Sequence, residues 1–113
     1  MPTVVITGAS GFLGKACCEA FAAAGYSVRA LVREPRAAQT GFYQADLPSR
    51  IDPRAFEGDI AAVIHCAYST KSASEEESRR TNIAGTEALL QIARKSSVRQ
   101  FIFVSSLAAH EGA

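Results

Sequence analysis

Hydrophobic positions along the chain fall into short continuous runs that alternate with segments of helical spacing. The runs at 3–7, 27–32 and 60–66 are apolar or β-branched at most positions, which predicts strands buried on both faces of a parallel sheet. Residues 41–46 predict a weaker third strand in chain order, and residues 100–105 predict a fifth. The pattern therefore indicates five strands.

The segments between these runs carry helical patterns. Residues 12–24 repeat apolar positions at helical spacing, and Gly25 supplies a C-terminal stop. Residues 73–95 are acidic in their first turns and basic in their last, as the helix dipole favours. A short helix is predicted after Asp52, with Pro53 at its first position. Strands alternating with helices predict an α/β fold, a parallel sheet covered by helices on both faces.

The composition is that of one ordinary globular domain. The chain has 113 residues, of which 48% are hydrophobic and 20% charged, and its formal net charge is +1. This balance gives no argument for nucleic acid or an anionic membrane as partner. The N-terminus does not resemble a signal peptide, and no apolar run approaches the roughly 20 residues of a membrane span. We therefore expect a cytoplasmic protein.

The cysteines suggest neither a disulfide framework nor a metal site. Cys17, Cys18 and Cys66 are odd in number, two are adjacent, and their spacing is not that of a metal-binding pair. They are interpreted as small buried apolar side chains in a reducing compartment, with a redox role as the less favoured alternative.

A glycine-rich loop is the strongest chemical signal. Gly8, Gly11 and Gly14 lie between a predicted strand and a predicted helix. Such glycines permit a tight turn, close backbone approach to a pyrophosphate, and close packing of helix on strand. The N–H groups and dipole of the following helix attract phosphate. Glycines that serve only the turn are the alternative, but the flanking strand and helix favour a dinucleotide site of the Rossmann type.

A nucleoside-triphosphate loop is a competing interpretation, because Gly14-Lys15 matches part of that motif. Its first glycine would fall at Ala9, and Ala16 replaces the Ser or Thr that would hold magnesium. We set this interpretation aside.

The end of the second strand bears on which dinucleotide is bound. An acidic residue there selects NAD by accepting the ribose hydroxyls. This chain has Arg33, which suits the 2′-phosphate of NADP through charge-assisted hydrogen bonds. Arg36 and Arg29 could add positive potential, whereas Glu34 is the rival that favours NAD. We predict NADP, with NAD as the alternative.

The opening segment Val4-Val-Ile-Thr-Gly-Ala-Ser-Gly-Phe-Leu-Gly14 resembles that of the extended short-chain dehydrogenases/reductases, the NAD-dependent epimerase/dehydratase family. Four further segments fall in that family's order: Asp46-Leu47, His65-Cys-Ala67, Asn82-Ile-Ala-Gly-Thr86 and Phe103-Val-Ser-Ser106. The resemblance spans essentially the whole chain. It implies a three-layer Rossmann domain over residues 1–113, with a five-stranded parallel sheet of strand order 3-2-1-4-5. The Arg33 position is most similar to the dihydroflavonol-reductase-like branch.

The resemblance also implies roles for matching positions. Ser106 would be the catalytic serine, which hydrogen-bonds the reacting substrate oxygen, and Asn82 would organise the site. His65 is interpreted as a strand residue without catalytic duty. The loop, the strand ends and the resemblance together give these candidate cofactor-binding residues: Gly8, Ser10, Gly11, Phe12, Leu13, Gly14, Arg33, Arg36, Asp46, Leu47, Cys66, Ala67, Tyr68, Asn82 and Ser105.

Catalysis in this family needs a Tyr four residues before a Lys, beyond the fifth strand. Four residues after the three tyrosines, Tyr26, Tyr43 and Tyr68, stand Ala30, Leu47 and Ser72. We therefore expect the catalytically incomplete N-terminal part of an oxidoreductase, epimerase or dehydratase, whose small-molecule substrate region lies downstream. The alternative is a non-catalytic nucleotide-binding or protein-interaction module. A homodimer that covers the open sheet edge is left open.

Overall fold

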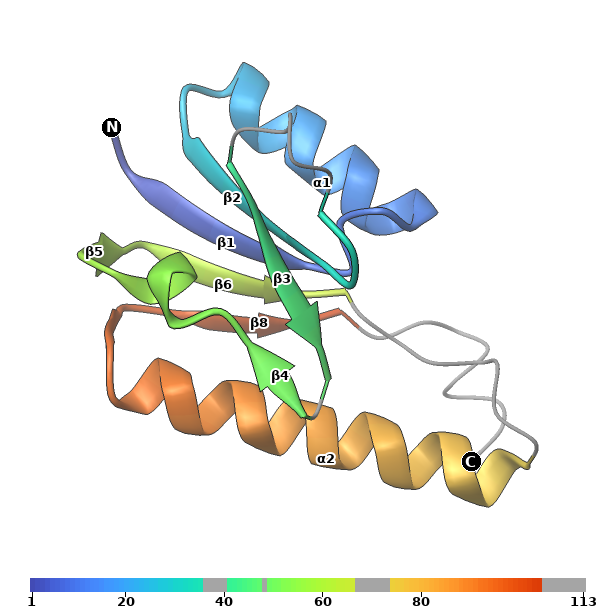
Figure 1. Ribbon diagram of the computed structural model, residues 1–113. Helices are drawn as coiled ribbons and strands as arrows, with labels where there is room; N and C mark the ends of the chain where they lie inside the picture. The colour runs from blue at the N-terminus through green and yellow to red at the C-terminus, as the bar shows by residue number, and fades with distance from the viewer. Residues whose placement is uncertain (36–40, 48, 67–73, 105–113) are drawn as a thin grey trace.

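The computed structural model describes residues 1–35, 41–47, 49–66 and 74–104. A central sheet separates two helices, which cover its opposite faces (Figure 1). The elements in chain order are β1 Thr3–Thr7, α1 Phe12–Ala23, β2 Ser27–Val32, β3 Phe42–Asp46, β4 Arg50–Ile51, the 3₁₀ helix η1 Pro53–Phe56, β5 Asp59–Ile60, β6 Ala62–His65, α2 Glu75–Arg94, β7 Ser97–Val98 and β8 Phe101–Phe103. Neither α-helix of this described part is long and apolar enough to cross a membrane.

The main sheet has six strands in the order β4-β3-β2-β1-β6-β8. Its central strand β1 pairs in parallel with β2 on one side and with β6 on the other. The five expected parallel strands are present in the expected order, as β3-β2-β1-β6-β8. The expected number of strands is exceeded by one, because β4 adds an antiparallel edge where Ala45 pairs with Ile51 and Asp46 with Arg50. Two residues are too few to show a strand periodicity in the sequence. A separate two-stranded sheet joins β5 and β7.

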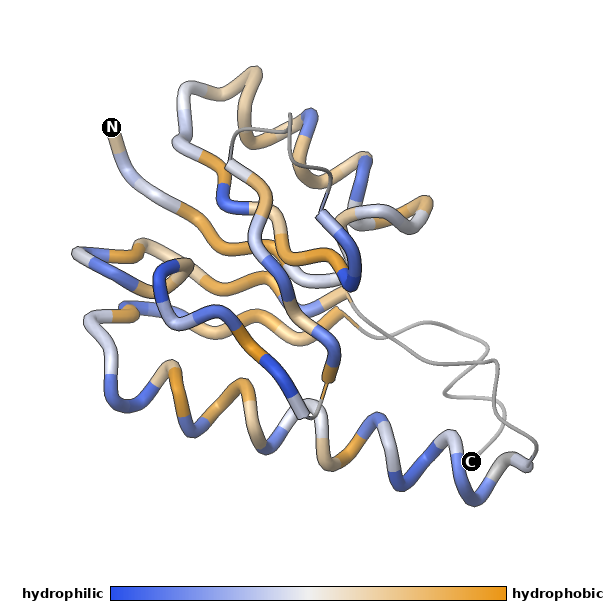
Figure 2. The backbone as a smooth tube through the Cα atoms, in the orientation of Figure 1, coloured by the Kyte–Doolittle hydropathy of each residue, from blue (hydrophilic) through white to orange (hydrophobic). Residues whose placement is uncertain are grey.

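Both faces of β1 are buried, as its continuous apolar sequence predicted. Val4 and Ile6 pack on the face that carries Cys17, Cys18 and Phe21 of α1. Val5 packs on the opposite face, in the cluster that contains Leu89 of α2. The alternation follows from the two-residue period of a strand. Hydrophobic segments accordingly run through the middle of the molecule, between the helices (Figure 2).

The C-terminus of α1 is closed by a Schellman motif. The Tyr26 N–H donates to the Phe21 carbonyl at 3.0 Å and the Gly25 N–H to the Ala22 carbonyl at 3.1 Å. Gly25 has φ +92°, which a side chain would strain. The rings of Phe21 and Tyr26 meet edge to face with centroids 5.0 Å apart. This motif turns the chain sharply into β2 and so sets α1 against the sheet.

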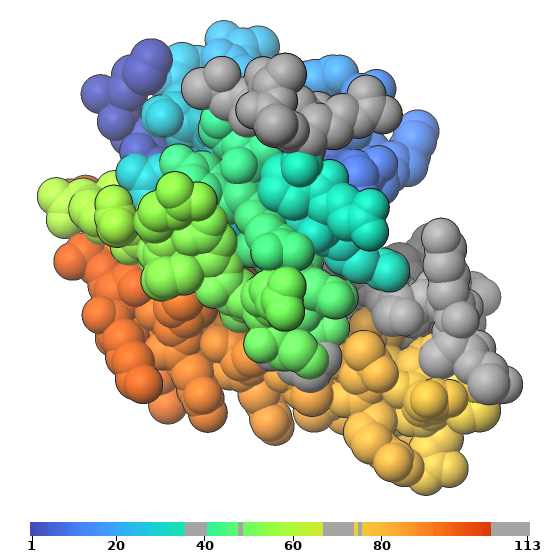
Figure 3. All heavy atoms as spheres, viewed as in Figure 1, coloured from blue at the N-terminus to red at the C-terminus, as the bar shows by residue number. Residues whose placement is uncertain are grey.

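The second half of the chain is organised by two capped helices. The Asp52 carboxylate accepts from the Arg54 N–H at 3.0 Å and begins η1, as predicted. Ser74 caps α2 by accepting from the Glu77 N–H at 3.1 Å. In the space-filling view, the β3–β4–η1 segment lies between the N-terminal part of the chain and α2 (Figure 3). This arrangement leaves the carboxyl ends of the parallel strands facing α2 and the glycine loop.

Candidate functional site

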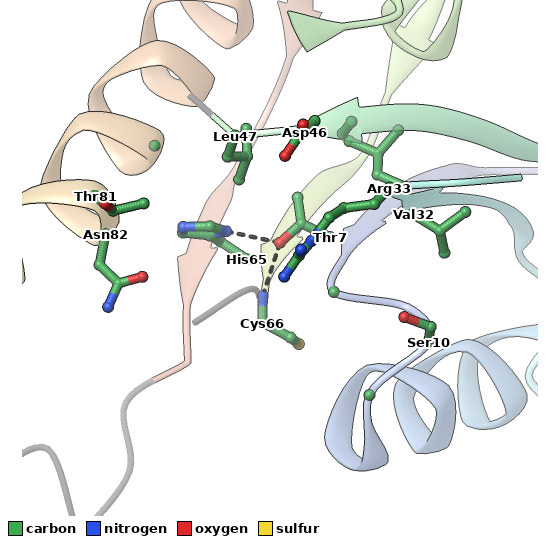
Figure 4. Close-up of a pocket in the computed structure, with 15 residues that line it drawn as sticks. Thr7, Ser10, Val32, Arg33, Asp46, Leu47, His65, Cys66, Thr81 and Asn82 are labelled. Atoms are coloured by element: carbon green, nitrogen blue, oxygen red, sulfur yellow. Dashed lines mark hydrogen bonds between the residues drawn. The ribbon is translucent and has the colours of Figure 1, made fainter. Parts of the chain in front are cut away.

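A pocket of about 380 Å³ lies at the carboxyl ends of β1, β2, β3 and β6 and against α2. Ligands of open parallel sheets bind at this edge, where the strand order reverses. Figure 4 shows the polar side chains that converge there. The residues that line the pocket are Thr7, Gly8, Ser10, Gly11, Leu31, Val32, Arg33, Ala45, Asp46, Leu47, His65, Cys66, Thr81, Asn82 and Gly85.

The three loop glycines have different physical tasks. Gly8 has φ +63°, a conformation that favours glycine. A Cβ on Gly14 would overlap the carbonyl oxygen of Gly8 and stand 2.6 Å from its carbonyl carbon. A Cβ on Gly11 would only touch that oxygen at 3.4 Å. Gly8 and Gly14 are therefore needed for the loop itself, whereas Gly11 leaves space on the pocket side.

The N-terminus of α1 is open toward a ligand. Its N-cap, Gly11, has no side chain to accept a hydrogen bond, and no acidic residue stands in the first turn. Phe12 is 95% exposed and Leu13 46% exposed, so their side chains do not cover the helix end. The first N–H groups of a helix have no intrahelical acceptor and carry the positive end of its dipole. This end of α1 is suited to a phosphate.

The ends of β2 and β3 bring opposite charges to the pocket. Arg33 is exposed at the end of β2, and its side chain extends into the pocket (Figure 4). Asp46 is exposed at the end of β3. Leu47 lies next to Gly85 of α2, where an added Cβ would be 3.1 Å from the Leu47 Cβ. The absence of a side chain at Gly85 thus lets α2 approach this wall closely.

Arg29 does not contribute to the pocket. Its guanidinium donates to the carbonyls of Ala55 at 2.9 Å and Glu57 at 2.7 Å. The side chain therefore holds the end of η1 against β2. Arg29 was considered either a source of added positive potential or a solvated strand residue, and its sequence position did not reveal these two carbonyl partners.

His65 is a pocket residue with two hydroxyl partners. It is 2% exposed, and its Nδ1 and Nε2 lie 2.7 Å from Thr7 Oγ1 and 3.0 Å from Thr86 Oγ1. Burial lowers the pKa of its imidazole below the usual 6.5, so the neutral form is favoured. The Cys66 N–H donates to Thr7 Oγ1 at 3.0 Å, which holds the chain just beyond β6.

The cysteines are half-buried rather than fully buried. Burial, with the neighbouring thiols, raises the pKa of Cys66 to about 12, and burial also raises that of Cys18. Thiols held protonated are poor nucleophiles, which disfavours the redox alternative for these two. Over the described ranges no group of three His, Cys, Asp or Glu side chains could hold a metal ion.

The structure brings together eight of the candidate cofactor residues: Gly8, Ser10, Gly11, Arg33, Asp46, Leu47, Cys66 and Asn82. Phe12, Leu13 and Gly14 form the adjoining helix start instead of the pocket lining. Five predicted site residues lie outside the described residues: Arg36, Ala67, Tyr68, Ser105 and Ser106. Sequence reasoning missed these lining residues: Thr7, Leu31, Val32, Ala45, His65, Thr81 and Gly85. Their position at strand ends, next to Asn82 (Thr81) or one helical turn from it (Gly85), was the signal that could have found them.

Comparison with known proteins decides the family. The model of the NAD-dependent epimerase/dehydratase family matches residues 4–111. The chain belongs to this family. The ceramide reductase of Caulobacter vibrioides (strain NA1000 / CB15N) is 37% identical over 116 residues, which cover 96% of this chain and 36% of that protein. The 4-hydroxy-2-methyl-3-oxo-4-farnesyl-3,4-dihydroquinoline-1-oxide ketoreductase of Stigmatella aurantiaca is 35% identical over 110 residues, covering 89% of this chain and 32% of that protein.

Solved structures agree with this assignment. A short-chain dehydrogenase/reductase superfamily protein from Agrobacterium tumefaciens with bound NAD matches with a TM-score of 0.74 at 28% identity, covering 92% of this chain and 32% of that chain. The resemblance inferred from the glycine loop and the four later segments is thereby confirmed, as is the Rossmann-like α/β fold. The chain spans about a third of the length of the curated relatives it matches.

Proposed function

We propose that this chain binds NADP in the pocket at the carboxyl ends of its strands and forms the cofactor-binding part of a reductase. The observation that carries the choice of NADP is Arg33, an exposed guanidinium that lines the pocket at the end of β2. A guanidinium suits a ribose 2′-phosphate, because its planar fork of N–H groups forms charge-assisted hydrogen bonds with two phosphate oxygens. NAD remains the alternative that the experiment below distinguishes.

The residues present fit a dinucleotide. The pocket volume of about 380 Å³ is within the range of small-molecule sites, roughly 300–1,000 Å³. The loop from Gly8 to Gly11 and the uncapped α1 end would hold the pyrophosphate. Asp46 and Leu47 would border the adenosine, with Leu47 limited in its position by α2 at Gly85. The nicotinamide supplies or accepts hydride when it is bound.

The remaining assignments extend the resemblance. Asn82, on the α2 wall of the pocket, would organise the reacting end of the site. Ser106 would hydrogen-bond the substrate oxygen, and Cys66 would border the cofactor beyond β6. The remaining proposed cofactor contacts are Arg36, Ala67, Tyr68 and Ser105. We propose a small-molecule carbonyl or alcohol as substrate in the full-length protein, because relatives that match the chain are reductases.

Nucleotide titrations test the proposal. NADPH and NADH are titrated separately by calorimetry into the wild-type chain, Arg33→Ser and Arg99→Ser. Arg99 is an exposed arginine that precedes β8, outside the pocket, so its variant controls for net charge. NADPH should bind wild type more tightly than NADH, and Arg33→Ser should weaken NADPH by about 10- to 100-fold, since a charged hydrogen bond contributes roughly 1.5–3 kcal/mol. Arg99→Ser should bind as wild type does.

Two results would contradict the choice of NADP. One is tighter binding of NADH by the wild-type chain. The other is an equal loss of NADPH and NADH affinity in Arg33→Ser, because only NADP carries the phosphate that the guanidinium would contact. Binding of neither nucleotide would overturn the proposed site as a whole.

A further inference from the structure

His65 joins three elements that form the pocket. Thr7, at its Nδ1, ends β1 just before the glycine loop. Thr86, at its Nε2, lies on α2 one turn after Asn82. The imidazole itself ends β6. Both partners are hydroxyls, and each can donate or accept, so the direction of the hydrogen bonds must be found from their other contacts.

The contacts of Thr86 settle the tautomer. Its hydroxyl donates to the Asn82 carbonyl at 2.9 Å, and a hydroxyl has one proton to donate. At the 3.0 Å contact with His65, Thr86 must therefore accept, which places the imidazole proton on Nε2. In the neutral ring Nδ1 then accepts from the Thr7 hydroxyl. Thr7 Oγ1 accepts in turn from the Cys66 N–H, so each donor in this series of hydrogen bonds, from Cys66 to Asn82, has an acceptor.

This series of hydrogen bonds reaches α2 at Thr86, beside the half of the helix that has fewer buried side chains among the described residues. The fully buried apolar contact of α2 is Leu89, and Ala93 follows one turn later. Both lie in the C-terminal half of the helix. Among the residues of α2 that precede Gly85 and whose side chains are described, none is buried. The pocket wall made by Thr81 and Asn82 belongs to that less packed half.

We propose that His65 is a positioning residue: through the His65–Thr86 hydrogen bond it fixes the Thr81–Gly85 wall of α2 at the distance that the dinucleotide requires. The proposal rests on the proposed function for the identity of the ligand. The neutral, Nε2-protonated imidazole is the form that makes this bond while also accepting from Thr7. His65 thus acts on the site through α2 and has no part in the chemical step.

The surroundings of the ring keep it in that form. From β8, the rings of Phe101 and Phe103 pack on it with centroids 6.2 and 5.6 Å away. From β1 and α2 it meets hydroxyl groups. The charged side chains of the shared pocket are Arg33 and Asp46. Protonation would place a second N–H against Thr7, whose oxygen already accepts from the Cys66 N–H, and would reverse the hydrogen bond that Thr7 now donates.

Three variants separate positioning from general stability. Thr86→Val keeps the branched shape and removes the acceptor, whereas Thr86→Ser keeps the hydroxyl. His65→Gln retains an amide donor for Thr86 but has no pKa in the range studied. With NADPH at pH 8, Thr86→Val should bind about 10-fold more weakly, in line with the loss of one hydrogen bond. Thr86→Ser should bind within about 3-fold of wild type because it keeps the hydroxyl. His65→Gln alters the positioning residue itself, so only the pH dependence of its affinity is compared with that of wild type.

The pH profile gives a readout that a structural role alone would not move. As pH falls through the pKa of His65, which burial lowers below its usual 6.5, the affinity of the wild-type chain for NADPH should decrease. His65→Gln should show no such decrease. An imidazole ¹⁵N spectrum should show Nε2 protonated and Nδ1 bare. If Thr86→Val bound NADPH as tightly as wild type while its melting temperature was lowered, the hydrogen bond would serve stability alone and the proposal would be overturned. A ring protonated at Nδ1 would overturn it too.

Amide hydrogen exchange without nucleotide keeps this test independent of the proposed function. Thr86→Val should accelerate exchange over residues 81–85 but leave residues 89–93 as in wild type, and Thr86→Ser should restore protection. Unchanged exchange over 81–85 would refute the positioning role even if neither NADPH nor NADH binds. Failure of nucleotide binding with the expected exchange pattern would count against the proposed function alone.

Discussion

Replacing Gly14 by alanine tests the packing of the glycine loop most directly. The new Cβ would stand 2.6 Å from the Gly8 carbonyl carbon and 3.0 Å from the Ala9 Cα, and would overlap the Gly8 oxygen. All three neighbours are backbone atoms, so no side-chain rotation can relieve the contact. Either the helix start or the end of β1 must move.

The magnitude follows from two opposing effects. Alanine in place of glycine inside a helix gains about 1 kcal/mol. Overpacking typically costs about 1–3 kcal/mol. Because backbone atoms must shift at this site, we expect the cost to be at or above the upper end of that range. We expect a net loss of about 2 kcal/mol, out of the roughly 5–15 kcal/mol that a domain of this kind has in total. Since m in urea is about 1–3 kcal/mol per M for small proteins, the midpoint should fall by about 1 M.

Gly11→Ala is the matched control for Gly14→Ala. Its Cβ would meet only the Gly8 oxygen at 3.4 Å, an ordinary contact, and the one expected cost is that alanine is a poorer N-cap than glycine. The free energy of unfolding in urea should therefore fall by no more than about 1 kcal/mol. The same methyl would occupy space on the pocket side, so the affinity for nucleotide should also fall. A Gly14→Ala chain that unfolds within 0.5 kcal/mol of wild type, or a Gly11→Ala chain equally destabilised, would refute this account of the loop.

Two further predictions concern stability. The lowered pKa of His65 means that the unfolded chain binds a proton at this imidazole more tightly than the folded chain does. The contribution of neutral His65 to stability is therefore complete above about pH 6.5. This contribution to the free energy of unfolding should be lost as pH falls from 6.5 to the lowered pKa, by at most about 1.4 kcal/mol per pH unit. Urea titrations at several pH values measure the loss, and His65→Gln should not show it. Asp52 adds no change in this window, because its hydrogen bonds with Arg54 lower its pKa, so its stabilisation is present above its ordinary 3.8 and is lost only below that pH. Arg29→Met should lower the free energy of unfolding by about 1 kcal/mol in thermal unfolding, because two carbonyls at the end of η1 lose their donor. Arg29→Lys should recover part of that loss. No change in either variant would contradict the role of Arg29 in holding η1 against β2.

The elements set by local chemistry could be predicted from the sequence. The run before Gly8, the helix that ends at Gly25 and the cap at Asp52 follow from side-chain pattern and turn residues within a few positions. The antiparallel strand at Arg50 could not, because two residues show no period and their pairing depends on how the chain turns after Asp46.

The candidate site divides in the same way. Gly8 and Arg33 were predicted because each follows a predicted strand, and such ends meet at one edge of a parallel sheet. Asp46 was predicted from the family resemblance, and it lies at the same edge. His65 was correctly predicted as a strand residue, at the end of β6, but its two hydroxyl partners were not predicted. Its hydroxyl partners are 58 and 21 residues away in the sequence, and no local pattern reveals which polar groups the fold brings to an imidazole.

The central position of β1 has a consequence for how the protein is made. One edge of β1 pairs with β2, within the first 32 residues to leave the ribosome, but the other edge waits for Ala62–His65. At roughly 5–20 residues per second, that partner follows β2 by several seconds. During this interval an apolar, uncharged strand keeps an open edge, the feature that promotes association between nascent chains. Slow translation between β2 and β6 would therefore lower the yield of folded protein more than slow translation after β8.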